Sequence, residues 1–286
     1  MCMVNFKYNL DDFNIEVAPV SRPLMPWRDE VLNTARNIAE TTDRPIYLCH
    51  GGGIDGEVIG FAFLELGIKF TVLTYRHTQG TNVHDVRYAE HFCKRYNIPQ
   101  KIVPLDVARF YKEDIPRLTD DGYASFKAYS YLQLLSQEHV ESWGGCCVIG
   151  GGEQIYETID NQICLVFDQP MVNAVEWCKR NNANHHPFFH MHNSELFASY
   201  MKIDLVDLLL DKPEYFENTL DNFSHEKIMA YHRYWKDMLR RPKFTGYEYI
   251  PRDLQIFFRD NMYLKYKDIQ KDLRIPIATL KEQLGI

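Results

Sequence analysis

Three consecutive glycines interrupt the chain in the segment CHGGGIDGE, residues 49–57, between an apolar run and a segment with helical spacing. Successive glycines let a backbone approach an anion closely, and their N–H groups add to the positive end of the following helix dipole. Asp55 falls in the first turn of that helix, where a carboxylate either caps the helix or holds Mg²⁺ against phosphate oxygens. We therefore predict a phosphate-binding loop, with Asp55 as the candidate metal ligand. Its residues are Gly51, Gly52, Gly53, Ile54, Asp55 and Gly56.

Other glycine motifs fit this loop less well. A Walker A loop would need G-x-x-x-x-G-K-[ST], which the chain lacks. Glycines 51, 53 and 56 fit G-x-G-x-x-G, but Tyr75 and Arg76 stand where a dinucleotide-binding fold carries its acidic residue. The run from His50 to Gly53 mimics an esterase oxyanion loop, yet no G-x-S-x-G nucleophile elbow is present. A tight turn that packs without any ligand is the non-functional alternative.

The loop resembles the S-G-G-x-D-S pyrophosphate loop of the PP-loop ATP pyrophosphatases, the adenine nucleotide alpha-hydrolase-like family. The resemblance is closest to the PAPS-reductase-like branch, including its phage-encoded members, and it covers residues 44–248. Three further segments match that branch in chain order. They are Asn82–Ala89 (N-x-x-D-x-x-Y-A), the second glycine turn in Val148–Glu153, and Arg241–Glu248 (R-x-K-x-T-G-x-E).

This resemblance implies a Rossmann-like, HUP-type domain that binds ATP and Mg²⁺. Such an enzyme would cleave ATP between the α- and β-phosphates and transfer AMP to an acceptor, which the sequence does not identify. Adenine would lie against the backbone near Leu73 and Tyr75. Asn82 and Asp85 would face the ribose or a metal. Alternatively they have a structural role, in which Asn82 begins the next helix and Asp85 lies in its first turn. The second turn adds Gly150, Gly151 and Gly152 to the expected nucleotide site.

The chain departs from the family motif at both loop serines, which are Gly51 and Gly56 here. The backbone N–H groups remain, but two hydroxyl donors are lost, each worth about 0.5–1.5 kcal/mol in a neutral hydrogen bond. Nucleotide binding is compatible with this change, whereas catalysis is left open. The alternative function is a catalytically silenced nucleotide-binding or scaffold protein.

Missing cysteine motifs narrow the choice within the family. The last of the seven cysteines is Cys178, so the C-terminal redox cysteine of a sulfonucleotide reductase is absent. None of the cysteines forms a C-x-x-C pair, and we expect neither a structural zinc nor an iron–sulfur cluster. Cys146 and Cys147 fall on an apolar strand, where buried structural thiols are the commoner case.

Three basic groups are weaker candidates. Lys127 precedes a helical stretch and could reach a phosphate, although a solvated lysine is the simpler interpretation. His190 and His192 share one face of an extended segment and could hold a metal, but Phe188 and Phe189 beside them favour packing. The basic cluster of Arg240, Arg241 and Lys243 could neutralise an anionic substrate or simply end a helix.

The elements around these residues alternate strand and helix. Apolar strands are expected at 45–49, 70–75, 101–105, 146–149 and 163–167, with helices at 54–66, 84–96 and 127–139. Alternation at this spacing predicts a doubly wound α/β fold with a mostly parallel five-stranded sheet. Beyond residue 193 the pattern is helical only, at 205–210, 225–239, 254–266 and 277–284. We predict a nucleotide-binding domain at 1–200 and a helical C-terminal region at 201–286 that packs on it.

Composition agrees with a globular enzyme or binding protein. The 286 residues are 45% hydrophobic and carry a net charge of −7, which argues against bulk electrostatic binding to nucleic acid. No run of about 18 apolar residues is present, and the N-terminus has no apolar signal region. We expect a cytoplasmic protein, or one in the host cytoplasm if phage-encoded. The oligomeric state is open.

Overall fold

The computed structural model describes residues 4–7, 14–152, 155–160, 162–202, 227–228, 230–239, 241, 247, 249–268, 270 and 272–286. Its centre is a four-stranded parallel sheet with strand order β5-β4-β3-β6. The strands are β3 (Ile46–Cys49), β4 (Phe70–His77), β5 (Gln100–Leu105) and β6 (Cys146–Ile149). This confirms the doubly wound α/β class and four of the five expected strands.

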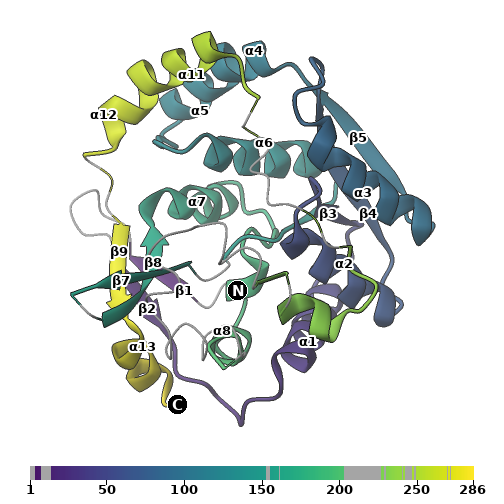
Figure 1. Cartoon of the computed structure of the whole chain (residues 1–286), viewed down its shortest axis with the longest axis vertical. Coiled ribbons are helices and arrows are strands. Elements are labelled where there is room, and N and C mark those ends of the chain that lie inside the picture. The colour runs from purple at the N-terminus through teal and green to yellow at the C-terminus, as the bar shows by residue number, and fades with distance from the viewer. Residues whose placement is uncertain are drawn as a thin grey trace.

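Helices cover both faces of this sheet (Figure 1). One face carries α1 (Trp27–Glu40), α2 (Ile54–Glu65) and α3 (Val83–Arg95). The other carries α5 (Ile115–Asp120), α6 (Ala128–Ser142), α7 (Val172–Arg180) and α11 (Arg252–Phe258). Alternate residues of β3 point to opposite faces, so Leu48 packs into the first layer and Tyr47 into the second.

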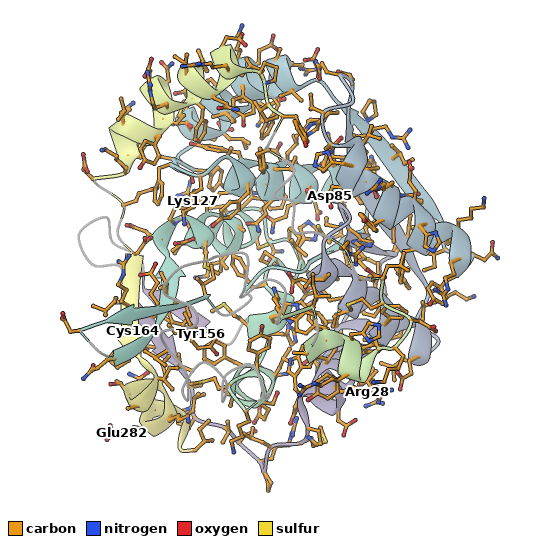
Figure 2. The ribbon with its side chains drawn as sticks, in the orientation of Figure 1. Arg28, Asp85, Lys127, Tyr156, Cys164 and Glu282 are labelled. Carbon is orange, nitrogen blue, oxygen red and sulfur yellow. The ribbon has the colours of Figure 1, made fainter. Side chains whose placement is uncertain are left out.

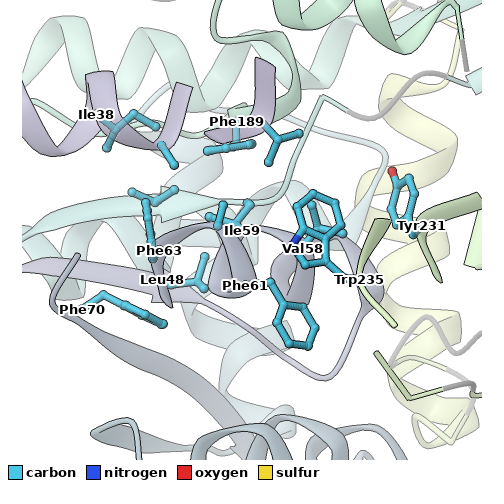
Figure 3. Close-up of a cluster of buried hydrophobic side chains, with 14 of the residues drawn as sticks. Ile38, Leu48, Val58, Ile59, Phe61, Phe63, Phe70, Phe189, Tyr231 and Trp235 are labelled. Carbon is cyan, nitrogen blue, oxygen red and sulfur yellow. The ribbon is translucent and has the colours of Figure 1, made fainter. Parts of the chain in front are cut away.

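The core between α1, α2, α3 and β3 is dense and apolar. Every residue of α2 from Gly56 to Phe63 is buried, so this helix is enclosed on nearly all sides. Figure 3 shows its side chains Val58, Ile59 and Phe61 packed together with Leu48 of β3 and Trp235. Because the core fixes α2 so firmly, the loop that precedes the helix is held in place at the edge of the sheet.

A separate antiparallel sheet corrects the expected fifth strand. Residues 163–167 lie in β8 (Gln162–Asp168), which pairs with β7 (Ile155–Ile159) and β9 (Asp272–Pro276), not with the parallel sheet. The C-terminal region is therefore not helical only, since β9 supplies a strand to this sheet. A two-stranded hairpin, β1 (Val4–Lys7) and β2 (Asn14–Val17), also forms near the N-terminus.

The remaining elements connect these layers. They are α4 (Val107–Arg109), the π-helical turn Phe110–Asp114, α8 (Ser194–Tyr200), the π-helical turn Arg259–Tyr263, α12 (Leu264–Tyr266) and α13 (Ile277–Leu284). The expected helix at 205–210 lies outside the described residues, and that at 225–239 is described only in part. The domain boundary at residue 200 stays a prediction. Among the described residues, no helix is long and apolar enough to cross a membrane.

Candidate functional site

The glycine loop lies where the strand order of the parallel sheet reverses. β3 pairs with β4 on one side and with β6 on the other, so Cys49 lies beside both Leu73 and Ile149. After β3 the chain continues to β4 in the same sheet, whereas after β6 it continues to β7 in the antiparallel sheet. Because the two connections diverge, a crevice opens at the carboxyl ends of β3 and β6. This position is the usual ligand site of open α/β sheets. The first glycine turn follows β3 and the second, residues 150–152, follows β6.

The start of α2 is arranged to receive an anion. Gly53 occupies the N-cap position with φ −70° and ψ 152°, and as a glycine it has no side chain to cap the helix. The first N–H groups of a helix carry partial positive charge and lack partners inside the helix. A Cβ atom at Gly51 or Gly53 would meet no heavy atom within 4 Å. The loop backbone is therefore open on the side where a phosphate would approach.

Gly52 has a different role from its neighbours. Its φ is +115°, and a Cβ atom there would lie 2.1 Å from the backbone carbonyl oxygen of Asp85 at the start of α3. Only glycine accommodates both this conformation and this close approach. Gly52 thus fixes the loop against α3, and it brings the Asp85 carboxylate to the edge of the crevice.

Asp55 is held by two side chains from the C-terminal region. Lys227 Nζ lies 2.8 Å from its Oδ1, and the Tyr231 hydroxyl donates to the same oxygen at 3.1 Å. His190 Nε2 is 3.9 Å from Oδ1. Burial opposes ionisation, but Lys227 and His190 together hold the pKa of the Asp55 carboxyl below its ordinary value. The carboxylate is therefore charged and already neutralised by Lys227.

These contacts do not fit Asp55 to Mg²⁺. Both of its oxygens face Lys227 Nζ, at 2.8 and 2.9 Å, and a metal would have to displace that cation. The described residues contain no group of three His, Cys, Asp or Glu side chains that could hold a metal ion. The metal role of Asp55 stays a prediction.

Replacement of Asp55 by Asn separates a structural role of the carboxylate, as the partner of Lys227, from a role as a metal ligand. We expect Asp55→Asn to lower the free energy of unfolding by about 3 kcal/mol, because it removes the carboxylate that faces the buried Lys227 cation. If the carboxylate is structural, the ratio of ATP affinities measured in Mg²⁺ and in EDTA will match that of the wild type. A selective loss of affinity in Mg²⁺ would instead establish Asp55 as a metal ligand. Calorimetry in both buffers provides the comparison, with urea unfolding for the stability.

A cavity of about 510 Å³ lies in front of the loop. Gly51, Gly53, Asp55 and Gly56 form part of its wall, and Asp85, Lys127 and Asp168 also line it. Figure 2 shows Asp85 and Lys127 on different elements around the centre of the molecule. A second cavity of about 240 Å³ shares Cys49, His50 and Gly51 with the first. Together they provide space for a nucleotide-sized ligand.

The residues expected around adenine line the smaller cavity. Leu73 and Tyr75 of β4 are both there, as is Asn82. The Asn82 side chain accepts from the backbone N–H of His77 at 2.9 Å and donates to the carbonyl of Tyr75 at 3.0 Å. It thus holds the end of β4 in place. Its side chain does not cap α3, and a contact with ribose or metal stays a prediction.

The second glycine turn is packed tightly. A Cβ atom at Gly150 would lie 3.0 Å from the backbone nitrogen of Gly56, and one at Gly151 would lie 2.7 Å from the carbonyl oxygen of Pro187. Gly152 has φ +81° and packs on Met191. All three glycines line the larger cavity. Close packing accounts for each of them, and a contact with nucleotide stays a prediction.

Three of the other basic candidates, His190, His192 and Arg241, are buried. His190 and His192 fall in and beside a short 3₁₀ turn, where His192 Nε2 is 3.1 Å from Asn37 Oδ1, and they are not part of a metal cluster among the described residues. Arg241 forms a buried ion pair with Glu57 in the first turn of α2. Arg240 and Lys243 lie outside the described residues. Lys127 is not simply solvated, because it pairs with Asp168.

Sequence reasoning missed the partners of the loop and of Lys127. Lys227 and Tyr231 lie in the segment expected as a helix at 225–239, but neither their type nor their spacing marks them as partners of Asp55. Asp168 ends β8, and Tyr129 donates to its Oδ2 at 2.9 Å. His50 is 1% exposed beneath the loop, and neither of its ring nitrogens has a hydrogen-bond partner among the described residues.

Comparison with solved structures returns distant similarities. The chain is similar to U34-tRNA thiolase NcsA from Methanococcus maripaludis with its [4Fe-4S] cluster, at 12% identity and a TM-score of 0.35 over 77% of this chain and 83% of that one. It is similar to the NH3-dependent NAD synthetase of Campylobacter jejuni, at 16% identity and a TM-score of 0.36 over 86% of this chain and 96% of that one. It is also similar to NMN synthetase from Francisella tularensis, at 11% identity and a TM-score of 0.37 over 86% of this chain and 94% of that one.

The three TM-scores are 0.37 or less, and none of these structures tests the expected PAPS-reductase-like branch. No family model and no curated protein matches the sequence. Because identity is 16% or less, the chemistry of the site depends on the residues of this chain.

Proposed function

We propose that the protein binds an adenine nucleotide with its phosphates on the Gly51–Gly56 loop. The observation that carries this proposal is the glycine at the N-cap of α2, with Gly51 and Gly53 open towards a cavity of about 510 Å³ at the reversal of strand order. Anions bind at such helix ends because unpaired N–H groups and the helix dipole act together. The smaller cavity beside Leu73 and Tyr75 would then take the base.

The proposed reaction is adenylyl transfer. An acceptor oxygen would attack the α-phosphorus of ATP, the bond to the bridging oxygen would break, and pyrophosphate would leave with the electron pair. The loop N–H groups would stabilise the negative charge that develops on the leaving group. This stabilisation comes from the backbone and does not depend on a side chain that acts as a base.

Calorimetry with ATP tests the binding step directly. Titration of ATP into the folded wild-type protein should give saturable binding in the micromolar to low millimolar range. An absence of heat at millimolar ATP, in protein whose fold is verified by circular dichroism, would refute the proposal. Pyrophosphate release in the presence of candidate acceptors would then separate an enzyme from a binding protein.

The silenced alternative is tested at the two positions where the family motif has serine. A serine at Gly51 meets no heavy atom within 4 Å of its Cβ, so Gly51→Ser should leave stability unchanged and strengthen ATP binding about 2- to 10-fold. A serine at Gly56 would place Cβ 2.9 Å from His50 Nδ1, so Gly56→Ser should destabilise the fold by about 1–3 kcal/mol. Adding His50→Ala should recover much of that loss.

Because a side chain at Gly56 overlaps His50, a variant that restores both serines must also replace His50. The combination of Gly51→Ser, Gly56→Ser and His50→Ala restores both hydroxyls without the clash. Pyrophosphate release that appears only in this triple variant would support a silenced ancestor. Release by the wild type would exclude it. ATP dissociation constants and urea unfolding of each variant complete the series.

A further inference from the structure

A second polar cluster lies on the wall of the larger cavity that β8 and the start of α6 provide. Lys127, at the N-cap of α6, pairs with Asp168 at the end of β8. Only 7% of the Asp168 side chain is exposed, and Tyr129 donates to its Oδ2 at 2.9 Å. All three residues line the cavity that the glycine loop also faces. The proposed nucleotide chemistry uses none of them.

This cluster carries more negative than positive charge. Asp168 lies directly opposite Asp272 in the antiparallel register of β8 and β9. Like charges in this arrangement are destabilising. Asp272 Oδ1 is buried and accepts no hydrogen bond within the described residues, while its Oδ2 lies 3.8 Å from Arg274. Arg274 also pairs with Glu157, at 2.9 Å. Three carboxylates therefore share two cations.

The Asp272 carboxyl group responds to this imbalance. Burial and the neighbouring Asp168 raise the pKa of Asp272 to about 6, and Lys127 and Arg274 offset only part of that effect. At neutral pH the cluster is left one positive charge short. A neutral residue at position 272 would remove the repulsion between Asp168 and Asp272. Packing alone therefore does not explain why two acids face each other.

The cavity wall near Asp168 is apolar, which distinguishes an organic cation from a metal ion. The apolar side chains that line the same cavity come from β8, from the segment before α7, from the turn before α8 and from α8 itself. They include Leu165, Phe167, Met171, Phe188, Met191 and Phe197. A hydrated metal ion gains nothing from such walls, whereas an aliphatic or aromatic body would bury its surface against them.

We propose that Asp168, with Tyr129, binds the ammonium group of an amine whose apolar body lies against this wall. Asp272, opposite Asp168 in the sheet and outside the cavity lining, adds negative charge behind it. The amine would compete with Lys127 for Asp168 and supply the missing positive charge. The proposal rests on the proposed function in one respect, that the amine-bearing molecule is the acceptor of AMP. Its binding does not require nucleotide.

Two probes of similar size test the charge preference. Phenylethylamine and 2-phenylethanol are titrated into the wild-type protein at pH 7.5, without nucleotide, and dissociation constants are measured by ligand-observed NMR. We expect the amine to bind at least about tenfold more tightly than the alcohol, a difference of about 1.4 kcal/mol. Asp168→Asn should abolish the preference. Asp272→Asn should reduce it and also relieve the repulsion, so this variant remains informative if Asp168→Asn fails to fold.

Two further variants make the test specific. Lys127→Met should strengthen amine binding, because the ligand no longer competes with a lysine for Asp168. Asp120→Asn, an exposed acid on α5, should leave the preference unchanged. Equal affinity for amine and alcohol would overturn the proposal, as would displacement of the amine by submillimolar MgCl₂, which would indicate a metal site.

ATP binding measured on the same samples keeps the two proposals apart. Amine preference without ATP binding would retain this subsite and refute the nucleotide function. ATP binding without amine preference would retain the nucleotide function and refute this subsite.

Discussion

The folded protein should lose stability steeply as the pH falls below about 6.5. Burial lowers the pKa values of seven histidines. They fall to about 3 for His50 and His186 and to about 4 for His77 and His192, and they also lie below the ordinary value for His139, His185 and His190. In the unfolded chain these groups titrate near 6.5. Between the two pKa values the unfolded chain binds protons that the folded chain does not, so falling pH favours unfolding.

The expected effect is large. Each histidine that stays neutral in the fold contributes up to about 1.4 kcal/mol per pH unit within its window. The four histidines with pKa values of about 3 to 4 together contribute up to about 5 kcal/mol per pH unit. The total stability of typical proteins is about 5–15 kcal/mol. The stability is fully present above about pH 6.5, and we expect unfolding near pH 5.

Urea unfolding followed by tryptophan fluorescence at pH 7.5, 6.5 and 5.5 measures this slope. His186→Gln should flatten it by up to about a quarter, because one of the histidines with a lowered pKa no longer titrates. His91→Gln, at an exposed position on α3, is the matched control and should leave the slope unchanged. A free energy of unfolding that is constant from pH 7.5 to 5.5 would contradict the prediction.

Gly52→Ala should abolish nucleotide binding and destabilise the fold. The new Cβ would lie 2.1 Å from the backbone carbonyl oxygen of Asp85, which cannot rotate away, and φ is +115° at this position. Either the loop or the start of α3 must move, at a cost of about 3 kcal/mol or more. Because the loop and Asp85 both line the larger cavity, we expect ATP affinity to fall by at least about 100-fold.

The matched control is Gly51→Ala, one residue earlier. No heavy atom lies within 4 Å of a Cβ built there, so this variant should keep both its stability and its ATP affinity. Calorimetry with ATP and thermal unfolding of both variants make the comparison. Wild-type ATP affinity in Gly52→Ala would show that the phosphates bind elsewhere.

The local chain pattern was enough to predict the parallel sheet and the place of the loop. Short apolar runs such as Ile46–Cys49 and Cys146–Ile149 are strands because their residues are buried on both faces. Glycines at the end of β3, followed by a helical period, predicted the turn into α2. These features depend on neighbours in the sequence, so periodicity and glycine content encode them.

The antiparallel sheet could not be predicted in this way. The segment at 163–167 was correctly expected as a strand, but its partners, β7 and β9, give it to a different sheet. β9 is a five-residue segment whose partner β8 lies more than 100 residues earlier. A short strand has no distinctive period, and its state is decided by the hydrogen bonds that a distant segment offers.

The charged partners within the site were also decided by the tertiary structure. Asp55 was identified from its position in the loop, but its partner Lys227 is 172 residues away. Lys127 was expected to be solvated, and Asp168, 41 residues on, pairs with it at the cavity wall. A charge in a sequence shows only that a partner or solvent is needed. Which of the two it meets depends on how the chain closes around the crevice, because burial makes an unpaired charge too costly to retain.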